Sequence, residues 1–127
     1  MKFAFLRLIA RDVQGLVGFY ETVTGQKADW LAPVFAEIGM AGGVIAIGGS
    51  ETVALFREGS AQPASNRTAI LESLVQDVDA EFSRLKDLVE VVQEPKDLPW
   101  GNPAAPFRDP AGPPVTPFPP VTHLQRV

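Results

Sequence analysis

One pattern of elements occurs twice in this sequence, at an offset of 65 residues. The tripeptide at 11–13 (RDV) falls on 76–78 (QDV), and Phe5 falls on Ile70. In each copy a strand-like apolar run precedes the aspartate, and apolar residues at helical spacing follow it. A β-α-β-β-β unit therefore appears twice, and such a repeat decides which folds need to be considered.

The first copy, which we name module 1, covers residues 1–58. The apolar run 3–10 is rich in strand formers, Asp12 is placed as an N-cap, and 15–24 (GLVGFYETVT) has the apolar spacing of an amphipathic helix. Gly25 is expected to end that helix in a left-handed conformation. Three apolar runs separated by turn residues then predict a meander with strands at 34–40, 43–48 and 52–58.

The second copy, module 2, covers residues 67–122 after a polar linker at 59–66. Residues 68–75 are strand-like, and Asp77 is placed as the N-cap of a helix that carries apolar residues from Val78 to Val89. Residues 89–94 favour another strand. The repeat is poorly defined beyond residue 95.

Proline is concentrated at the end of module 2, where ten of the 12 prolines lie between residues 95 and 120. A closing strand at 113–120 would contain five of them. Because proline has no backbone N–H, it is expected only at strand starts, bulges and edges. The segment therefore favours either an edge strand or an irregular surface segment.

Composition limits the classes of function. The 127 residues are 46% hydrophobic, which suits one compact domain, and the net charge of −4 argues against nucleic acid or an anionic membrane as partner. The chain has no cysteine, which excludes disulfides and thiolate zinc sites. Arg7 interrupts the first apolar run, so we expect a strand there rather than a secretory signal, and a cytoplasmic protein.

Several motifs together carry a family resemblance. They are RDV at 11–13, FYE at 19–21 with Gly25, DVD at 77–79, PWG at 99–101 and FRDPAG at 107–112. In this order they resemble the vicinal oxygen chelate superfamily, which contains glyoxalase I, extradiol dioxygenases, and fosfomycin and bleomycin resistance proteins. The resemblance implies an α+β fold in which two β-α-β-β-β modules form curved sheets around a cavity, usually in a homodimer.

The resemblance also marks positions where relatives hold metal ligands. The first His would lie seven residues before the capping aspartate, where this chain has Phe5 and, in module 2, Ile70. A Glu after the Asp-Pro-x-Gly turn corresponds to Thr116, and a further Glu in module 1 corresponds most nearly to Ala54. These residues offer no carboxylate or imidazole to a cation. We therefore expect no metal, no cofactor and no catalytic residues.

Strand alternation then selects residues that face the expected cavity. If Phe5 points inward, Arg7 and Ile9 do so too, as do Glu72 and Leu74 with Ile70. Alternatively, the two charged residues pair with each other or face solvent. Trp100 and Phe56 are either ligand contacts or packing residues. The candidate ligand-binding residues are Phe5, Arg7, Phe56, Ile70, Glu72, Trp100 and Thr116.

The function expected from these residues is metal-independent binding of a small aromatic or cationic organic ligand. Sequestration of an antibiotic, as in bleomycin resistance proteins, is the leading specific hypothesis. The rival is a metal-dependent lyase or dioxygenase that uses displaced ligands such as Glu37, Glu72 or His123. A third reading is an interaction module whose cavity is filled by its own side chains.

Overall fold

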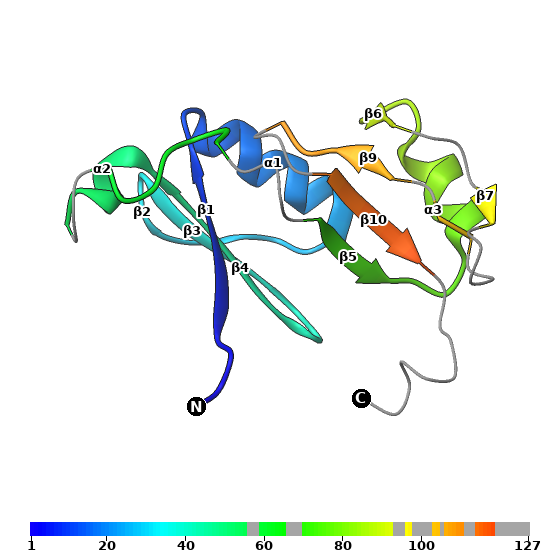
Figure 1. The fold of residues 1–127 in the computed structure, drawn as a ribbon, viewed down its shortest axis with the longest axis horizontal. Coiled ribbons are helices and arrows are strands. Elements are labelled where there is room, and N and C mark those ends of the chain that lie inside the picture. Colours follow the sequence, from blue (N-terminus) through cyan, green and yellow to red (C-terminus); the bar gives the residue numbers. More distant parts are fainter. Residues whose placement is uncertain are drawn as a thin grey trace. The chain divides into compact units, whose positions relative to one another are not determined.

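The structure is a computed structural model, and Figure 1 shows it as a ribbon. It divides the chain into two compact units, Met1–Asn66 and Arg67–Val127, which contain module 1 and module 2. Among the residues described, no helix is long and apolar enough to span a membrane. The described residues are 1–55, 59–65, 70–92, 96–97, 103–104, 106–110 and 114–118.

Module 1 is a four-stranded sheet, sheet A, with one long helix against it (Figure 1). The strand order is β1-β4-β3-β2, in which β1 and β4 are parallel and the other neighbours are antiparallel. Its elements are β1 (Phe5–Ala10), α1 (Val13–Thr24), β2 (Asp29–Ala32), β3 (Phe35–Met40), β4 (Gly43–Gly49) and the short α2 (Ser50–Val53).

Local signals fix both ends of α1, as the sequence predicted. The Asp12 Oδ1 accepts a hydrogen bond from the Gly15 N–H at 2.9 Å, which satisfies one of the free donors of the first turn. At the other end Gly25 has a φ of 71°, and its N–H donates to the Glu21 carbonyl. Between these caps the helix buries Leu16, Val17 and Tyr20.

The core of module 1 lies between α1 and one face of sheet A. Register places Leu8 of β1 beside Ile47 of β4, which in turn pairs with Ala36 of β3. Ile47 and Ala36 are fully buried. A Cβ on Gly49 of the same face would lie 3.5 Å from the Val13 side chain, so this face meets the helix. The opposite face of the sheet has no such cover from α1.

The meander differs from the one that the sequence predicted. The third strand is β2, which precedes β3, and the predicted strand at 52–58 is wrong at its start because Thr52 and Val53 lie in α2. Both are buried there, and the Thr52 hydroxyl donates to the Gly49 carbonyl at 2.7 Å. Burial and this hydrogen bond therefore override the strand preference of the β-branched residues. Residues 56–58 lie outside the described part.

Module 2 repeats this topology in sheet B. The strand order β5-β10-β9-β6 matches that of sheet A. The strands that come first and last in the sequence, β5 and β10, are again parallel neighbours, and the other neighbours are antiparallel. The structure thus confirms an α+β fold of two β-α-β-β-β modules. The elements are β5 (Leu71–Leu74), α3 (Val78–Leu85), β6 (Glu90–Val91), β9 (Phe107–Arg108) and β10 (Pro114–Phe118), with a small hairpin of β7 (Lys96–Asp97) and β8 (Pro103–Ala104).

The proline-rich segment forms a strand inside the sheet, which corrects the expectation of an edge strand or an irregular segment. β10 lies between β5 and β9. Its ladder with β5 runs from Val115 to Phe118, whereas β9 opposes only Pro114 and Val115. No described residue of β9 therefore lies opposite Pro117. On the side of β10 that faces β9, the N–H that Pro117 lacks would have had no partner in the ladder between these two strands.

Candidate ligand-binding faces of the two sheets

The face of sheet A that points away from α1 holds the first group of candidate residues. Side chains of paired residues share a face, and facing alternates along each strand. Arg7 pairs with Ala46, which pairs with Glu37, and these residues belong to the face opposite Ile47. We call this surface the open face of sheet A. It comprises Phe5, Arg7 and Ile9 of β1, Phe35, Glu37 and Gly39 of β3, and Val44, Ala46 and Gly48 of β4.

The Arg7 side chain crosses this face and ends on an aromatic ring. Its guanidinium carbon lies 4.9 Å from the centre of the Phe35 ring, although β4 runs between the two strands. Only small residues, Ala46 and Gly48, lie on this face of β4 along the way. A guanidinium over a ring face is attracted by the ring quadrupole. The contact holds the planar cation against the open face.

Gly48 is required where the Arg7 and Phe35 side chains meet. A Cβ at this position would lie 2.7 Å from the Thr52 hydroxyl and 3.2 Å from Cδ2 of Phe35. Thr52 belongs to α2, which turns back over this end of β4. Helix α2 and the Phe35 ring therefore close one end of the open face.

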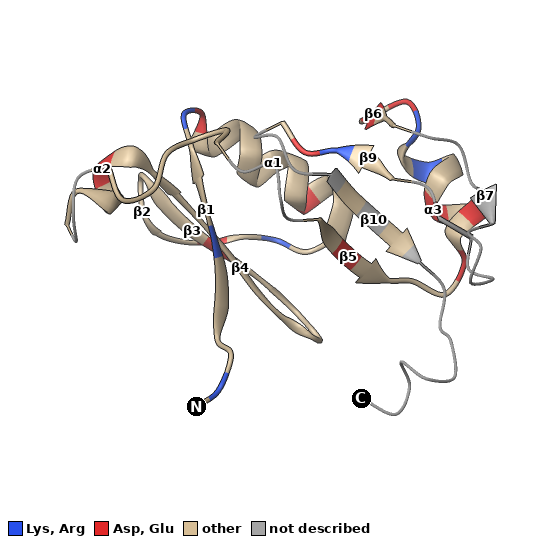
Figure 2. Cartoon of the chain, in the orientation of Figure 1, with Lys and Arg blue, Asp and Glu red and all other residues tan. Residues whose placement is uncertain are grey.

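Charged residues are sparse along β1, β3 and β4, as Figure 2 shows. One row across the sheet nevertheless carries three charged residues, two from β1 and β3 and one from β2. Arg7 lies at the β1 end of the row, and Glu37 pairs directly with Asp29 of β2 at the other end. Glu37 is half-buried and Asp29 is exposed. Within the described ranges no three His, Asp or Glu side chains gather closely enough to hold a metal ion.

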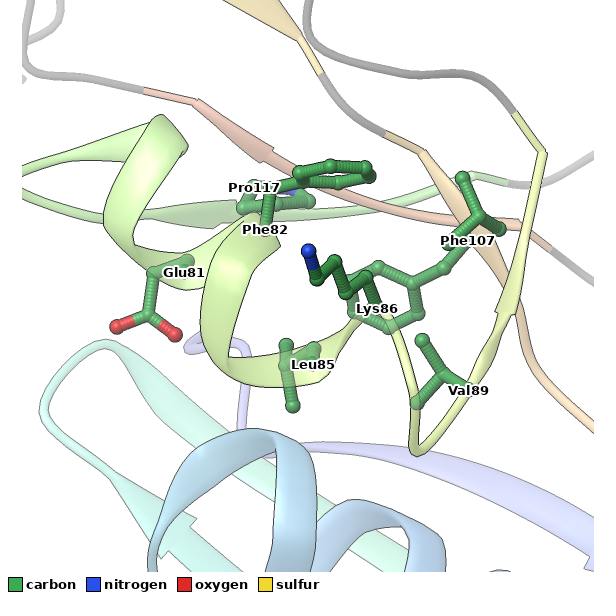
Figure 3. A pocket seen from close by; sticks show the side chains of 8 residues that line it. Glu81, Phe82, Leu85, Lys86, Val89, Phe107 and Pro117 are labelled. Atoms are coloured by element: carbon green, nitrogen blue, oxygen red, sulfur yellow. The ribbon is translucent and has the colours of Figure 1, made fainter.

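Pro117, which pairs with Ser73, lies against Phe82 and Leu85 of α3 (Figure 3). Glu72 and Leu74 therefore belong to the other face of sheet B, which we call its open face. Along β5, Leu71 and Ser73 are half-buried whereas Glu72 and Leu74 are exposed, so facing alternates as the sequence predicted. Ile70 precedes the strand and is 59% exposed. Exposed leucine and isoleucine side chains on a sheet face favour contact with an apolar molecule or surface.

The predicted site residues are found as follows. Phe5, 53% exposed, and Arg7, half-buried, share the open face of sheet A. Thr116 lies in β10 at the register position opposite Glu72. Trp30, a tryptophan that could also contact a planar ligand, pairs with Ala36 and thus belongs to the α1 side of its sheet. Phe56, Trp100 and His123 lie outside the described residues.

Register also identifies residues that the sequence reasoning missed. Phe35 was not considered, although alternation with Glu37 along β3 was a signal for its facing. Arg7 pairs with Ala46 just as Glu72 pairs with Thr116, so Ala46 is the module 1 counterpart of Thr116. The match of Ala54 to a ligand position stays a prediction, and Ala54 itself follows α2 outside the sheet.

The donor set does not fit the divalent metal that the family resemblance implies. Phe5 and Ile70 occupy positions where the resemblance implies the first ligands, and neither has a side-chain oxygen or nitrogen, while Thr116 has only a hydroxyl. Hard cations need several oxygen ligands, and borderline ones need imidazole or carboxylate.

The fold is that of a paired-module α+β protein. It has two β-α-β-β-β modules with identical strand order, and in each module the helix leaves one face of the sheet open. The sequence matches the Glyoxalase/Bleomycin resistance protein/Dioxygenase superfamily over residues 2–115. The chain belongs to this superfamily. Among curated proteins, none matches the sequence.

Solved structures share the fold across nearly the whole chain. A glyoxalase/bleomycin resistance protein/dioxygenase from Nocardioides has 22% identity and a TM-score of 0.79, covering 96% of this chain and 85% of its own. A protein of unknown function from Agrobacterium tumefaciens str. C58 has 24% identity and a TM-score of 0.80, covering 95% of both chains. A lactoylglutathione lyase from Agrobacterium tumefaciens has 20% identity and a TM-score of 0.68, covering 93% and 92%. At these identities the likeness concerns the fold alone.

Proposed function

We propose that this chain binds a small organic ligand, aromatic or cationic, on its open sheet faces without a metal ion, and that it protects by sequestering an antibiotic. The observation that carries the proposal is the character of the two positions equivalent to a first metal ligand. Both Phe5 and Ile70 are large apolar side chains, and both are more than half exposed. Exposed side chains of this kind supply apolar contact area and no coordination.

The polar residues around Phe5 would orient such a ligand. Arg7 is held over Phe35, and Glu37 and Asp29 lie side by side on the same row. A few fixed polar groups in an apolar site typically set specificity. The two carboxylates suit a cationic group, and the Phe35 and Phe5 rings suit an aromatic one.

Metal dependence is tested first. Protein purified without chelator is subjected to elemental analysis, and its melting temperature is measured with and without EDTA. We expect the protein to contain less than one metal ion per chain and its melting temperature to be the same with and without EDTA. Stoichiometric metal together with a chelator-sensitive melting temperature would contradict it and favour the metal-dependent lyase or dioxygenase.

Ligand binding is tested with a library of aromatic and glycopeptide compounds. A compound that binds only the native state raises the melting temperature. Phe5→Ser and Ile70→Ser are expected to weaken binding by about tenfold, because an anchor residue typically contributes more than about 1 kcal/mol. Leu88→Ser is the control, since Leu88 is 64% exposed but follows α3 and belongs to no strand of sheet B. Failure of every compound would favour an interaction module instead.

A further inference from the structure

A hollow lies at the edge of module 1, where the first turn of α1 meets β2. It offers about 440 Å³ to a ligand and is broadly open to solvent, and this volume is within the range of small-molecule pockets. Most of its lining belongs to β2, the last strand of sheet A, in which every residue is exposed. The lining residues are Gln14, Trp30, Leu31, Ala32 and Pro33.

A β-bulge in β2 shapes this lining. Trp30 pairs with Ala36 of β3. Ala32 pairs with the adjacent residue of β3, Phe35, so Leu31 has no counterpart on the partner strand. An extra residue of this kind bends its strand and re-aims the side chains around it. Trp30 and Leu31 therefore both border the hollow, and they are 44% and 62% exposed, whereas Ala36 beside them is fully buried.

One side of α1 leaves this edge of the sheet uncovered. Gln14, Gly18 and Glu21 follow one another at helical spacing, so they lie on the same side of the helix. That side faces the start of β2, because Oε2 of Glu21 accepts a hydrogen bond from the Ala28 N–H at 2.8 Å. Among the described residues, nothing beyond the helix backbone lies within 4 Å of a Cβ added to Gly18. The helix therefore leaves open space between Gln14 and Glu21.

A carboxylate lies within reach of the hollow. Ala28, whose N–H bonds to Glu21, is two residues before Trp30, which is about 7 Å along an extended chain. Glu21 is half-buried, and it makes no ion pair with any described residue. Gln14 lies two turns before it on the same side of α1, about 10 Å away. The hollow thus has an amide at one end, an indole along its length and a negative charge beyond the other end.

We propose that this hollow binds an arylalkylamine, with its aromatic ring against Trp30 and its ammonium at Glu21. Aromatic rings attract one another in offset-stacked and edge-to-face arrangements, and a partly buried carboxylate attracts an ammonium. A hydroxyl on the ring would donate a hydrogen bond to the Gln14 amide oxygen. The net charge of −4 favours the approach of a cation. The site is separate from the open face of sheet A, because it lies on the α1 side of that sheet.

The test uses tyramine as the probe and the full-length protein. Tyramine is titrated while the methyl NMR signals of Leu31 and Ala32 are followed. Saturable shifts with a millimolar dissociation constant are expected, because the open hollow covers only part of the ligand. Para-ethylphenol, which lacks the ammonium, should bind about twofold to fivefold more weakly. Phenethylamine, which lacks the hydroxyl, should also bind more weakly than tyramine.

Three variants locate the site. Gly18→Leu fills the open space beside β2 and should block tyramine, and leucine is a better helix former than glycine. Trp30→Ala removes the aromatic surface and should weaken tyramine about threefold to tenfold. Glu21→Gln keeps an acceptor for the Ala28 N–H but removes the charge, so it should weaken tyramine about twofold to fivefold and leave para-ethylphenol unchanged. Glu37→Gln is the matched control, because Glu37 is also half-buried in module 1 but lies on the open face.

Three results would overturn the proposal. The first is the absence of saturable shifts of the Leu31 and Ala32 signals at millimolar tyramine in the unmodified protein. The second is saturable binding that both Gly18→Leu and Trp30→Ala leave unchanged. The third is weakening of tyramine by Glu37→Gln but not by Glu21→Gln, which would place the amine on the open face of sheet A instead.

Discussion

The guanidinium carbon of Arg7 lies 4.9 Å from the centre of the Phe35 ring, on the face of sheet A that α1 leaves open. The two residues come from β1 and β3, and the Arg7 side chain passes over β4 to reach the ring. This arrangement depends on the small residues Ala46 and Gly48 in β4. The contact therefore links the position of a charged candidate residue to the packing of three strands.

The coupling between Arg7 and Phe35 can be measured by a double-mutant cycle. We expect Arg7→Met and Phe35→Leu to show a coupling free energy of about 0.5–1 kcal/mol, the size of a cation–π contact near a surface. Urea unfolding of the wild type, both single variants and the double variant supplies the four free energies. Arg11→Met, at an exposed position after β1, should show no coupling to Phe35→Leu. A coupling free energy of zero in the first cycle would show that the contact does not stabilise the protein.

Gly48 gives a second prediction, because its neighbours leave no room for a methyl group. We expect Gly48→Ala to destabilise the protein by about 1–3 kcal/mol, since Thr52 and Phe35 would have to move. Gly39→Ala is the matched control: Gly39 lies on the same face, in β3, with nothing within 4 Å of an added Cβ. Chemical unfolding of both variants checks this. The cost of Gly48→Ala should fall in a Thr52→Ala background, and an unchanged cost would place the strain elsewhere.

Local signals made α1, α3 and the repeated topology predictable from the sequence. Asp12 and Asp77 each accept a hydrogen bond from the backbone N–H three residues later, which is the standard geometry of an N-cap. These contacts need only a few neighbouring residues. The alternation along β1 and β5 was equally predictable, because it follows from strand geometry alone.

The features that the sequence did not predict depend on residues far apart in the sequence. β2 is a four-residue strand with every residue exposed, and only its pairing with β3 defines it. Thr52 has a strand preference but is buried in α2. Phe35 and Ala46 were identified as part of the candidate site only from the register between β1, β4 and β3, which the local sequence does not specify. The facing of candidate residues was therefore predictable, whereas their neighbours were not.

The left-handed conformation of Gly25 gives a third prediction. Its φ of 71° is costly for a residue with a Cβ, by about 1–2 kcal/mol. We expect Gly25→Ala to lower the free energy of unfolding by about 1 kcal/mol, and Gly25→Asn to lower it less, because asparagine tolerates this conformation. Thermal unfolding monitored by circular dichroism ranks the three proteins. An alanine variant as stable as the wild type would indicate that α1 ends differently in solution.

Two glycines inside α1 should respond in opposite directions to the same substitution. At Gly18 nothing lies within 4 Å of an added Cβ, so Gly18→Ala is expected to stabilise the protein by up to about 1 kcal/mol through helix propensity. At Gly15 the added Cβ would collide with the Asp12 carboxylate, which caps the helix through the Gly15 N–H. Gly15→Ala should therefore lose most or all of that gain. Urea unfolding of both variants measures the difference, and an Asp12→Ala background should remove it, because the carboxylate is then absent. Equal stabilisation by the two substitutions in the wild-type background would show that the capping carboxylate moves aside without cost.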